Sequence, residues 1–263
     1  MDSRLLNKPA LAMVQPKAFP GTYKYDGSSI DEIIDKTLKE INMIKECGFD
    51  GIIVQNMNDM PIKQKSNFQT VAFLTRLCTE IKNYYPDLLM GILVNWDGVA
   101  SLAVAAAVNA DFIRIEHLYT GANVTSSGIL ESQAVDILEL KMRLGINIPI
   151  FADIYEVHGI PLGKKSHSDA AWEAVNETMA DGLFTSGKNT EESLSIAKQI
   201  KEKLPDTPVY LGGGANGENI SELIKEYDGV SVATWIKDGN MENDINPKKA
   251  KIFMKEVKSR REE

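Results

Sequence analysis

The sequence predicts an α/β protein that folds as one (β/α)8 barrel, a single domain over residues 1–263. Three observations support this class. Short apolar runs alternate with amphipathic stretches eight times along the chain. The runs are continuously apolar, as expected for parallel strands that are buried on both faces. The length of 263 residues fits one such barrel of about 250 residues, and no linker-like stretch divides the chain.

The predicted strands are the eight apolar runs themselves. We expect them at residues 10–14, 51–54, 88–94, 112–115, 148–152, 182–184, 208–211 and 229–233. Polar residues follow most of these runs. Since the carboxyl ends of barrel strands converge on one face, where functional groups gather, these polar residues are the first candidates for a site.

The stretches between the runs show helical periodicity and helix-end signals. Ser29 and Glu32 form a capping box before the first helix, and Gly48 ends that helix. Gly145 ends the fourth helix, and Thr190 and Asn216 are the predicted N-caps of the sixth and seventh. Apolar stripes mark the helices, and examples are Ile30, Ile33, Ile34, Leu38 and Ile41 in the first, Trp172, Val175 and Met179 in the fifth, and Ala250, Phe253, Met254 and Val257 in the last.

Composition excludes several classes of protein. The net charge of −8 argues against a nucleic-acid partner, which requires a surplus of Lys and Arg. No apolar run approaches the roughly 20 residues of a membrane span, and residues 1–8 lack the apolar core of a signal peptide. With only two cysteines, we expect a cytoplasmic protein without a disulfide framework. Barrels often self-associate through helix faces, so a homo-oligomer is expected.

Four connections from strand to helix are long, at residues 15–28, 117–129, 154–167 and 235–246. All four lie at the carboxyl end of the predicted barrel. Long ordered loops in a compact domain usually serve as lids or binding loops. The alternative is tolerated variation in surface loops.

The strongest local signal for a ligand is the seventh predicted strand, which runs into a glycine turn at residues 212–214. Glycines let backbone N–H groups approach an anion, and barrel enzymes often bind phosphate at their seventh and eighth strands. The alternative is a tight turn without a ligand, and the position in the fold favours phosphate. The predicted phosphate-binding residues are Ser186, Gly187, Gly213, Gly214, Ala215, Ala233 and Thr234.

The candidate catalytic residues are Asp153, Glu116 and Arg114. Asp153 ends an otherwise apolar strand, where a partly desolvated carboxylate could act as a general acid or base. Arg114 and Glu116 are two residues apart and point to the same face of their strand. If Arg114 faces the interior it must be paired, with Glu116 or Asp153 as its partner. An internal ion pair without catalytic duty is an equally supported interpretation.

Neutral hydrogen-bonding residues beyond the other strands suit recognition of sugar hydroxyls or amides. They are Gln15, Gln55, Asn56, Asn95 and Thr185. The histidines, His117, His158 and His167, lie in the rim loops without the spacing of a zinc site, so we expect no metal site built by the protein and no obligatory cofactor. Mg2+ could still accompany a phosphorylated ligand, assisted by Asp153 and Glu116.

These residues resemble the BtpA/SgcQ family from about residue 12 to the last helix. The best matches are Met13-Val14 with Phe19-Pro20-Gly21; Gly48-Phe49-Asp50-Gly51 leading to Asn56 and Asp59-Met60-Pro61; Phe112-Ile113-Arg114; Gly121-Ala122 with Thr125 and Gly128; Ala152-Asp153; and Gly229 through Thr234-Trp235-Ile236-Lys237. The resemblance implies a barrel related to the ribulose-phosphate-binding barrels. It also implies roles for Asn56, Asp59, Arg114, Asp153 and Thr234.

The chain departs from the family pattern at three positions. Gln15 lies where the family usually has histidine, Gln55 where glutamate is common, and Glu116 where asparagine is common. Two ionisable groups are thus replaced by amides, and a carboxylate appears on the fourth strand. If the family's chemistry uses the lost groups, this chain either runs another reaction or has moved the acid/base role to Glu116 and Asp153.

Two functions are compatible with these residues. The first is an enzyme of the lyase, isomerase or hydrolase type that acts on a small phosphorylated sugar or nucleoside-type metabolite. Asp153 would transfer the proton, Glu116 would assist, and Arg114 would stabilise developing negative charge. The second is a non-catalytic assembly or stability factor, because the resemblance includes a branch linked to photosystem I biogenesis. Another branch occurs in sugar-metabolism gene clusters.

Overall fold

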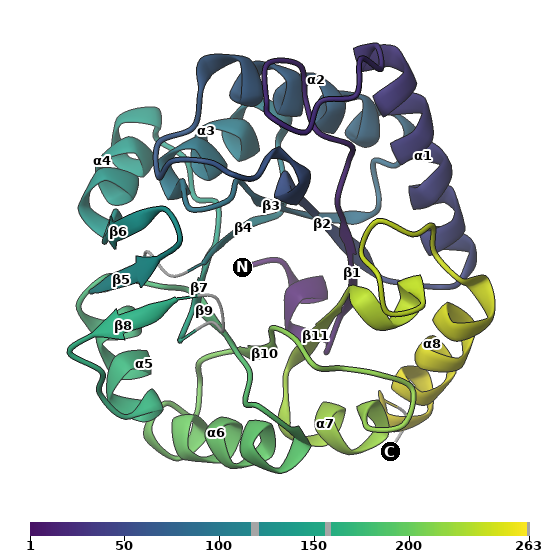
Figure 1. The fold of residues 1–263 in the computed structure, drawn as a ribbon. Coiled ribbons are helices and arrows are strands. Elements are labelled where there is room, and N and C mark those ends of the chain that lie inside the picture. The colour runs from purple at the N-terminus through teal and green to yellow at the C-terminus, as the bar shows by residue number, and fades with distance from the viewer. Residues whose placement is uncertain (117–120, 156–158, 262–263) are drawn as a thin grey trace.

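The protein forms a closed barrel of eight parallel strands with helices around it (Figure 1). In this computed structural model, the structure describes residues 1–116, 121–155 and 159–261. The barrel strands are β1 (Ala10–Val14), β2 (Gly51–Gln55), β3 (Leu89–Leu93), β4 (Phe112–Ile115), β7 (Ile150–Asp153), β9 (Gly182–Thr185), β10 (Val209–Leu211) and β11 (Gly229–Val232). They follow one another around the ring in chain order, and β11 pairs with β1 to close it. The predicted fold class is confirmed.

The helices lie outside the ring and connect consecutive strands (Figure 1). They are α1 (Ile30–Glu46), α2 (Phe68–Tyr84), α3 (Gly98–Val108), α4 (Ala134–Leu144), α5 (His167–Asn176), α6 (Thr190–Lys203), α7 (Ile220–Glu226) and α8 (Pro247–Arg261). Three short 3-10 helices are η1 (Ser3–Leu6), η2 (Met57–Asp59) and η3 (Thr234–Lys237). Within the described ranges, none of the helices could cross a membrane.

Several helix-end predictions are confirmed. The Ser29 hydroxyl accepts from the N–H of Glu32 at 3.2 Å, and the Glu32 carboxylate accepts from the N–H of Ser29 at 2.6 Å, which completes the capping box. Gly48 follows α1 with φ +89°, and Gly145 caps α4 with φ +63°. Both glycines therefore take the left-handed conformation that ends a helix without the steric cost of a side chain.

Three other helix-end predictions are wrong. Asn189 rather than Thr190 caps α6, because its side chain accepts from the N–H of Glu192 at 2.9 Å. Asn216 does not cap α7 directly; its side chain accepts from the two amides of Glu218 and Asn219 and closes the turn that precedes the helix. Met179 lies beyond the end of α5 with φ +60°, in the turn toward β9.

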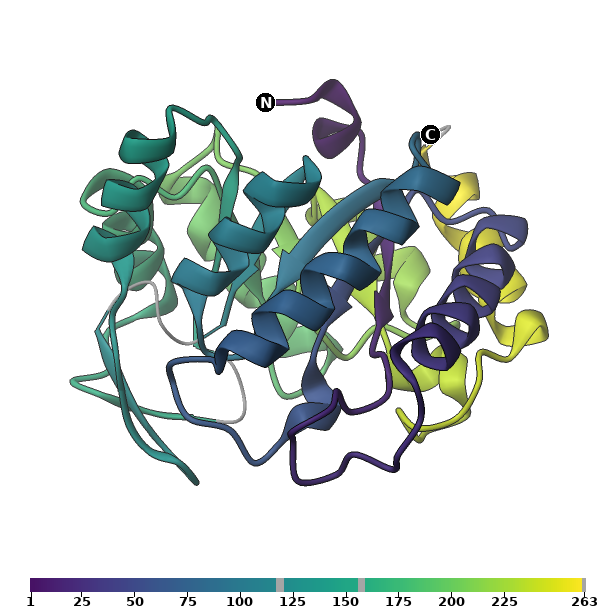
Figure 2. The same cartoon turned by 90° about the horizontal axis from the view of Figure 1, so that it is seen from above.

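Part of the fourth and fifth rim connections, predicted as loops, forms an accessory antiparallel sheet. Its strands are β5 (Ala122–Thr125), β6 (Gly128–Glu131) and β8 (Ile160–Leu162), in the order β6–β5–β8. The sheet lies at the end of the barrel opposite the N-terminus (Figure 2). Pro161 is tolerated because β8 is an edge strand, where a missing N–H breaks no second ladder.

Strand alternation divides the core into two layers. The barrel interior holds Leu5, Leu11, Met13, Ile53, Leu89, Leu93, Phe112, Phe151, Phe184 and Tyr210, whereas the other face of each strand packs on the helices. Glycines make room for the large interior rings. A Cβ on Gly91 would lie 2.3 Å from the Phe112 ring, and one on Gly182 would lie 2.4 Å from the Phe151 ring. Apolar side chains thus fill the half of the barrel interior that lies nearer the amino ends of the strands.

The amino ends of the strands are joined by four aspartates, one before every second barrel strand. Each carboxylate accepts a hydrogen bond at 2.8–2.9 Å from a backbone N–H at the start of the preceding barrel strand, and each also pairs with a cation from a helix. The sets are Asp50 with Ala10 and Arg261, Asp111 with Met90 and Lys82, Asp181 with Ile150 and Lys141, and Asp228 with Val209 and Lys201. This repeat fixes neighbouring strands relative to each other.

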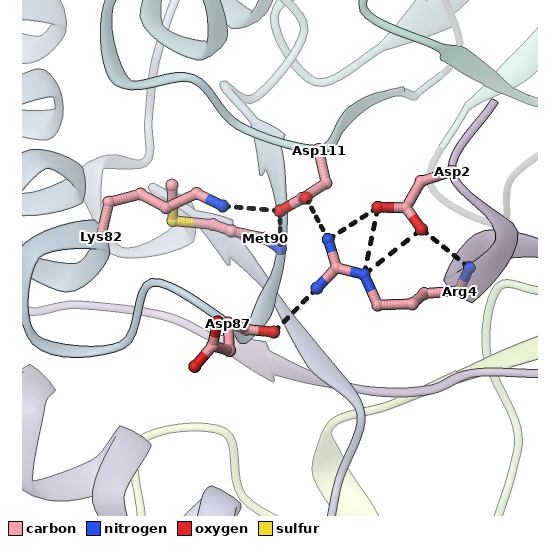
Figure 3. Close-up of polar contacts among 6 residues, drawn as sticks. All are labelled: Asp2, Arg4, Lys82, Asp87, Met90 and Asp111. Atoms are coloured by element: carbon pink, nitrogen blue, oxygen red, sulfur yellow. Dashed lines mark hydrogen bonds and ion pairs between the residues drawn. The ribbon is translucent and has the colours of Figure 1, made fainter.

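The segment η1 closes the amino end of the barrel. Figure 3 shows the Arg4 guanidinium donating to the Asp111 carboxylate at 2.9 Å and to the carbonyl of Asp87 at 2.8 Å. Leu5 is fully buried beneath the interior rings, and the Tyr210 hydroxyl donates to the Leu5 carbonyl. A ligand must therefore enter from the opposite, carboxyl end.

Asp111→Ala should lower the free energy of unfolding by about 2 kcal/mol, because it leaves the Met90 N–H and the Lys82 ammonium without their acceptor. Asp2→Ala, which removes a more exposed carboxylate from the same Arg4, should cost at most about 1 kcal/mol. Urea denaturation of both variants measures the difference. A loss below about 0.5 kcal/mol for Asp111→Ala would contradict the structural role of the aspartate repeat.

Candidate active site

Polar side chains replace apolar ones where the interior reaches the carboxyl ends of the strands. Continuing the alternation from Met13, Ile53 and Leu93 places Gln15, Gln55 and Asn95 inside, and Glu116 and Asp153 extend β4 and β7 in the same way. These five residues are all at least nine-tenths buried. The structure therefore brings together residues that the sequence placed on five separate strands.

Arg114 and Asp153 form a bidentate ion pair at the centre of this layer. The Arg114 Nε–Asp153 Oδ2 and Arg114 Nη2–Asp153 Oδ1 distances are both 2.8 Å. Only 4 % of the Arg114 side chain and 3 % of the Asp153 side chain are exposed. The sequence left Glu116 and Asp153 open as partners of Arg114, and the structure assigns this contact to Asp153. Two parallel charge-assisted hydrogen bonds hold both groups in one orientation.

The Arg114 guanidinium also connects the ion pair to the glycine turn. It lies over the Phe184 ring, 4.3 Å from the centroid, and Nη2 is 3.4 Å from the carbonyl oxygen of Gly212. The buried Ser231 hydroxyl donates to the same carbonyl at 3.2 Å. The Gly212 carbonyl is thus held from two sides, which fixes the peptide plane that begins the turn.

The four remaining polar residues of the layer form a chain of hydrogen bonds. Gln15 Nε2 donates to Gln55 Oε1 at 3.2 Å. Gln55 Nε2 donates to Asn95 Oδ1 at 2.7 Å and to Glu116 Oε1 at 3.4 Å. Neutral amides and one carboxylate therefore lie together beside the ion pair, a combination suited to binding hydroxyl groups and moving a proton.

The glycine turn and the end of β11 enclose a cavity of about 350 Å3. The N–H groups of Gly213, Gly214 and Ala215 donate no hydrogen bond within the described residues, and neither does that of Thr234. A Cβ on Gly213 would meet only Ser186 Oγ, at 3.9 Å, and Gly214 has φ +80°. The cavity is lined by Met13, residues 212–216, residues 231–235 and Gly239.

The cavity and the ion pair are adjacent at Gly212, at the carboxyl end of the barrel that we call the mouth. Asp153 itself lines a separate cavity of about 150 Å3 with Asn123 and Tyr155. A Cβ on Gly212 would lie 3.1 Å from Arg114 Nη2 and 3.5 Å from Asp153 Oδ1. The predicted anion cradle and the predicted catalytic carboxylate are therefore neighbours. No bulky side chain among the described residues stands between Gly212 and these two charged groups.

Four predicted residues lie away from this mouth. Thr185 follows Phe184 on the strand and faces the helices. Gly187 donates its N–H to the Ser193 hydroxyl at 2.9 Å, so that donor is already engaged. Asn56 and Asp59 lie in the connection after β2. The Asn56 side chain accepts a hydrogen bond from the N–H of Asn95 and donates one to the Asp59 carboxylate. Both line a separate cavity of about 450 Å3 beside α2.

Asp59 is a buried junction between the first and second rim connections. Its carboxylate accepts from the N–H of Phe19 at 2.8 Å and from Asn56 Nδ2 at 3.1 Å. Burial raises the pKa of the Asp59 carboxyl, although these hydrogen bonds favour the ionised form. These contacts hold the first rim connection in place beside Gln15.

Ser231 and Lys237 were missed in the sequence as site residues. The alternation that places Ala233 at the mouth also places Ser231 inside, which was the available signal for Ser231. Lys237 is buried, and its Nζ lies 2.7 Å from Glu40 Oε1 of α1. No local sequence pattern predicts this contact, because the two residues are far apart in the chain. This pair lines a cavity of about 310 Å3 between residues 15–28 and 234–246.

His117 and His158 lie outside the described residues, and His167 begins α5 with its ring against Tyr155. Over the described ranges, no three His, Cys, Asp or Glu side chains are grouped as metal ligands.

Asp153→Asn should destabilise the fold by about 3–5 kcal/mol, because it replaces the carboxylate that forms two hydrogen bonds with the buried Arg114 guanidinium by a neutral amide. Arg114→Met combined with Asp153→Leu should recover most of this loss, since it removes both charges and keeps the volume. Urea denaturation of the two variants tests the pairing. A wild-type free energy of unfolding for Asp153→Asn would show that the ion pair does not support the fold.

The comparisons with known proteins identify the family. A family model described as the BtpA family matches residues 6–259. An uncharacterised protein of Thermococcus kodakarensis is 34 % identical over 97 % of both chains. The photosystem I biogenesis protein BtpA of Synechocystis is 30 % identical over 94 % of this chain and 87 % of its own. The putative sgc region protein SgcQ of Escherichia coli is 27 % identical over 95 % and 94 %.

Solved structures show the same fold at low sequence identity. A thiamine phosphate pyrophosphorylase from Pyrococcus furiosus superposes with a TM-score of 0.58 and 17 % identity, covering 98 % of each chain. The match extends over the whole barrel and supports the fold independently of the strand assignment. With a family model that spans nearly the whole chain, the protein belongs to the BtpA family.

Proposed function

We propose that this BtpA-family barrel is an enzyme that acts on a small phosphorylated sugar or nucleoside-type metabolite by acid/base chemistry. One observation carries the proposal. Backbone N–H groups without acceptors among the described residues line a cavity whose Gly212 lies next to the buried Arg114–Asp153 pair. Buried polar groups in this arrangement suit a ligand with an anionic end and a reactive end.

The phosphate would lie in the cavity of the glycine turn. The amides of Gly213, Gly214 and Ala215 would donate to its oxygens, with the N–H and hydroxyl of Thr234 on the other side. Ser186 lies next to Gly213 and could add a hydroxyl donor, and Ala233 lines the opposite wall. Main-chain N–H groups can bind the anion without a positively charged side chain in the cavity.

The proton-transfer groups would be Asp153 and Glu116. Arg114 holds both Asp153 oxygens through two hydrogen bonds, which orients the carboxylate for proton transfer with a substrate. Glu116 lies beside amides that can orient a substrate hydroxyl. Arg114 would stabilise negative charge that develops on the substrate. Isomerisation, aldol-type cleavage and glycosyl-bond chemistry all use such groups beside an anchored phosphate.

Mg2+ could enter with the phosphorylated ligand, with Asp153 and Glu116 as oxygen ligands within reach of the mouth. We propose no obligatory cofactor.

A second candidate function is that of a non-catalytic assembly factor. Two observations favour it. The Synechocystis relative is named a photosystem I biogenesis protein, and the accessory sheet exposes large apolar side chains. These are Val124, Ile129, Ile160 and Leu162, which are 38–71 % exposed. Grouped apolar side chains on a surface are typical of protein contacts.

Isothermal titration calorimetry with inorganic phosphate and ribose 5-phosphate tests the enzymatic proposal. We expect wild type to bind both, and Gly213→Leu to weaken binding by more than tenfold, because the cavity accepts a side chain there that would occupy the anion's place. Thr234→Val should weaken it by about tenfold through loss of one hydroxyl donor.

The matched control is Lys36→Met, an exposed lysine that lies outside the glycine turn and should leave phosphate affinity unchanged. Absence of binding to wild type, or equal affinity for wild type and Gly213→Leu, would contradict the enzymatic proposal and favour the assembly factor.

A further inference from the structure

Gln15 carries a buried hydrogen-bond acceptor that the fold leaves unused. The residue is 8 % exposed, and its Oε1 atom has no hydrogen-bond partner among the residues that the structure describes. Its Nε2 donates to Gln55 Oε1 at 3.2 Å and to the Met241 sulfur at 3.3 Å. An unpaired buried carbonyl oxygen is destabilising, and such groups in native structures usually have a functional explanation.

The direction of the hydrogen-bond chain determines which atom of Gln15 is left over. An ionised carboxylate can only accept, so Gln55 must present its nitrogen to Glu116. The Gln55 Oε1 atom then faces Gln15, so Gln15 must donate a hydrogen bond to it through Nε2. The opposite assignment would set the Gln55 oxygen against the Glu116 oxygen. Glu116 thus fixes the free atom of Gln15 as an acceptor, across two intervening contacts.

Gln15 is within reach of a ligand held in the glycine-turn cavity. Strand β1 pairs with β11, and Met13 of β1 lines that cavity. Gln15 is two residues further along the same face of β1, about 7 Å away. It also lines the cavity of about 310 Å3 between the first and eighth rim connections, together with Met241. A ligand with its phosphate in the turn would meet Gln15 if its body extends along β1 past Met13.

We propose, on the basis of the proposed function, that Gln15 Oε1 accepts a hydrogen bond from a hydroxyl group of the phosphorylated ligand. Glu116, acting through Gln55, sets the orientation of the Gln15 side-chain amide. The ligand class is therefore a phosphate ester with a hydroxyl group on its body, not a phosphate ester with an apolar body. Glu116 acts on recognition here through two amides and not by contact.

Calorimetry with three probes tests this selectivity: inorganic phosphate, ribose 5-phosphate, and tetrahydrofurfuryl phosphate, which has the same skeleton without hydroxyls. Wild type should bind ribose 5-phosphate about tenfold more tightly than tetrahydrofurfuryl phosphate. Gln15→Met keeps the volume but removes the acceptor, so the ratio should fall to about threefold or less, with the affinity for inorganic phosphate unchanged. Lys36→Met, at the exposed edge of the same cavity, should keep the wild-type ratio.

Two further variants test the role of Glu116. Glu116→Gln removes the acceptor-only end of the chain, so the Gln15 amide can turn over and the ratio should fall. Adding Gln55→Glu restores an acceptor-only neighbour for Gln15 and should restore the ratio. A tenfold ratio that survives in Gln15→Met, a wild type without hydroxyl preference, or identical ratios in both Glu116 variants would each overturn the proposal.

Side-chain amide NMR tests the chain without any ligand. The Gln15 NH2 signals, assigned by their absence in Gln15→Met, should shift in Glu116→Gln, because a hydrogen bond joins Glu116 to Gln55 and another joins Gln55 to Gln15. Unmoved Gln15 signals would overturn the directed chain. Shifted signals in a protein that binds no phosphate probe would support the directed chain and overturn the proposed function, so the two failures are distinguishable.

Discussion

The Arg114–Asp153 ion pair is the interaction on which the site depends. The guanidinium of Arg114, which is carried by β4, contacts four other barrel strands or their ends. The contacted residues are Asp153, Phe184, Gly212 and Met13. A charge buried to this degree is tolerated only when it is paired and hydrogen-bonded. The same pairing sets the position of the Gly212 carbonyl and hence of the glycine turn. Ion pair and turn are one structural unit.

The two ends of the barrel perform different tasks. At the amino end, four aspartates each join a backbone N–H to a helix cation, and η1 fills the opening with Leu5. The four carboxylates and the four strand amides there are paired with each other and with helix cations, which is typical of groups that stabilise a fold. At the carboxyl end, amides of the glycine turn and the Gln15 carbonyl remain without partners in the described residues. Groups left unpaired at one end, beside buried charges, favour a ligand site.

The strands could be predicted closely because most are continuous apolar runs, and burial on both faces leaves little ambiguity. The accessory sheet could not, because β5, β6 and β8 have three or four residues each and alternate weakly. Alternation placed Arg114 and Glu116 on one face of their strand but did not decide whether that face is the interior, and the choice between Glu116 and Asp153 depends on distances across the barrel. Thr185 and Asn56 follow strand ends as the site residues do, yet one residue of offset turns each to the other face.

Turnover is the most direct test of whether this barrel is an enzyme. Phosphorylated sugars that bind should be followed by 1H and 31P NMR with wild type and with Glu116→Gln and Asp153→Asn, each checked for folding. Wild type should convert at least one bound compound, and the variants should convert it at least about 100-fold more slowly. Bound compounds that stay unchanged with wild type, or equal rates in all three proteins, would contradict the enzymatic function.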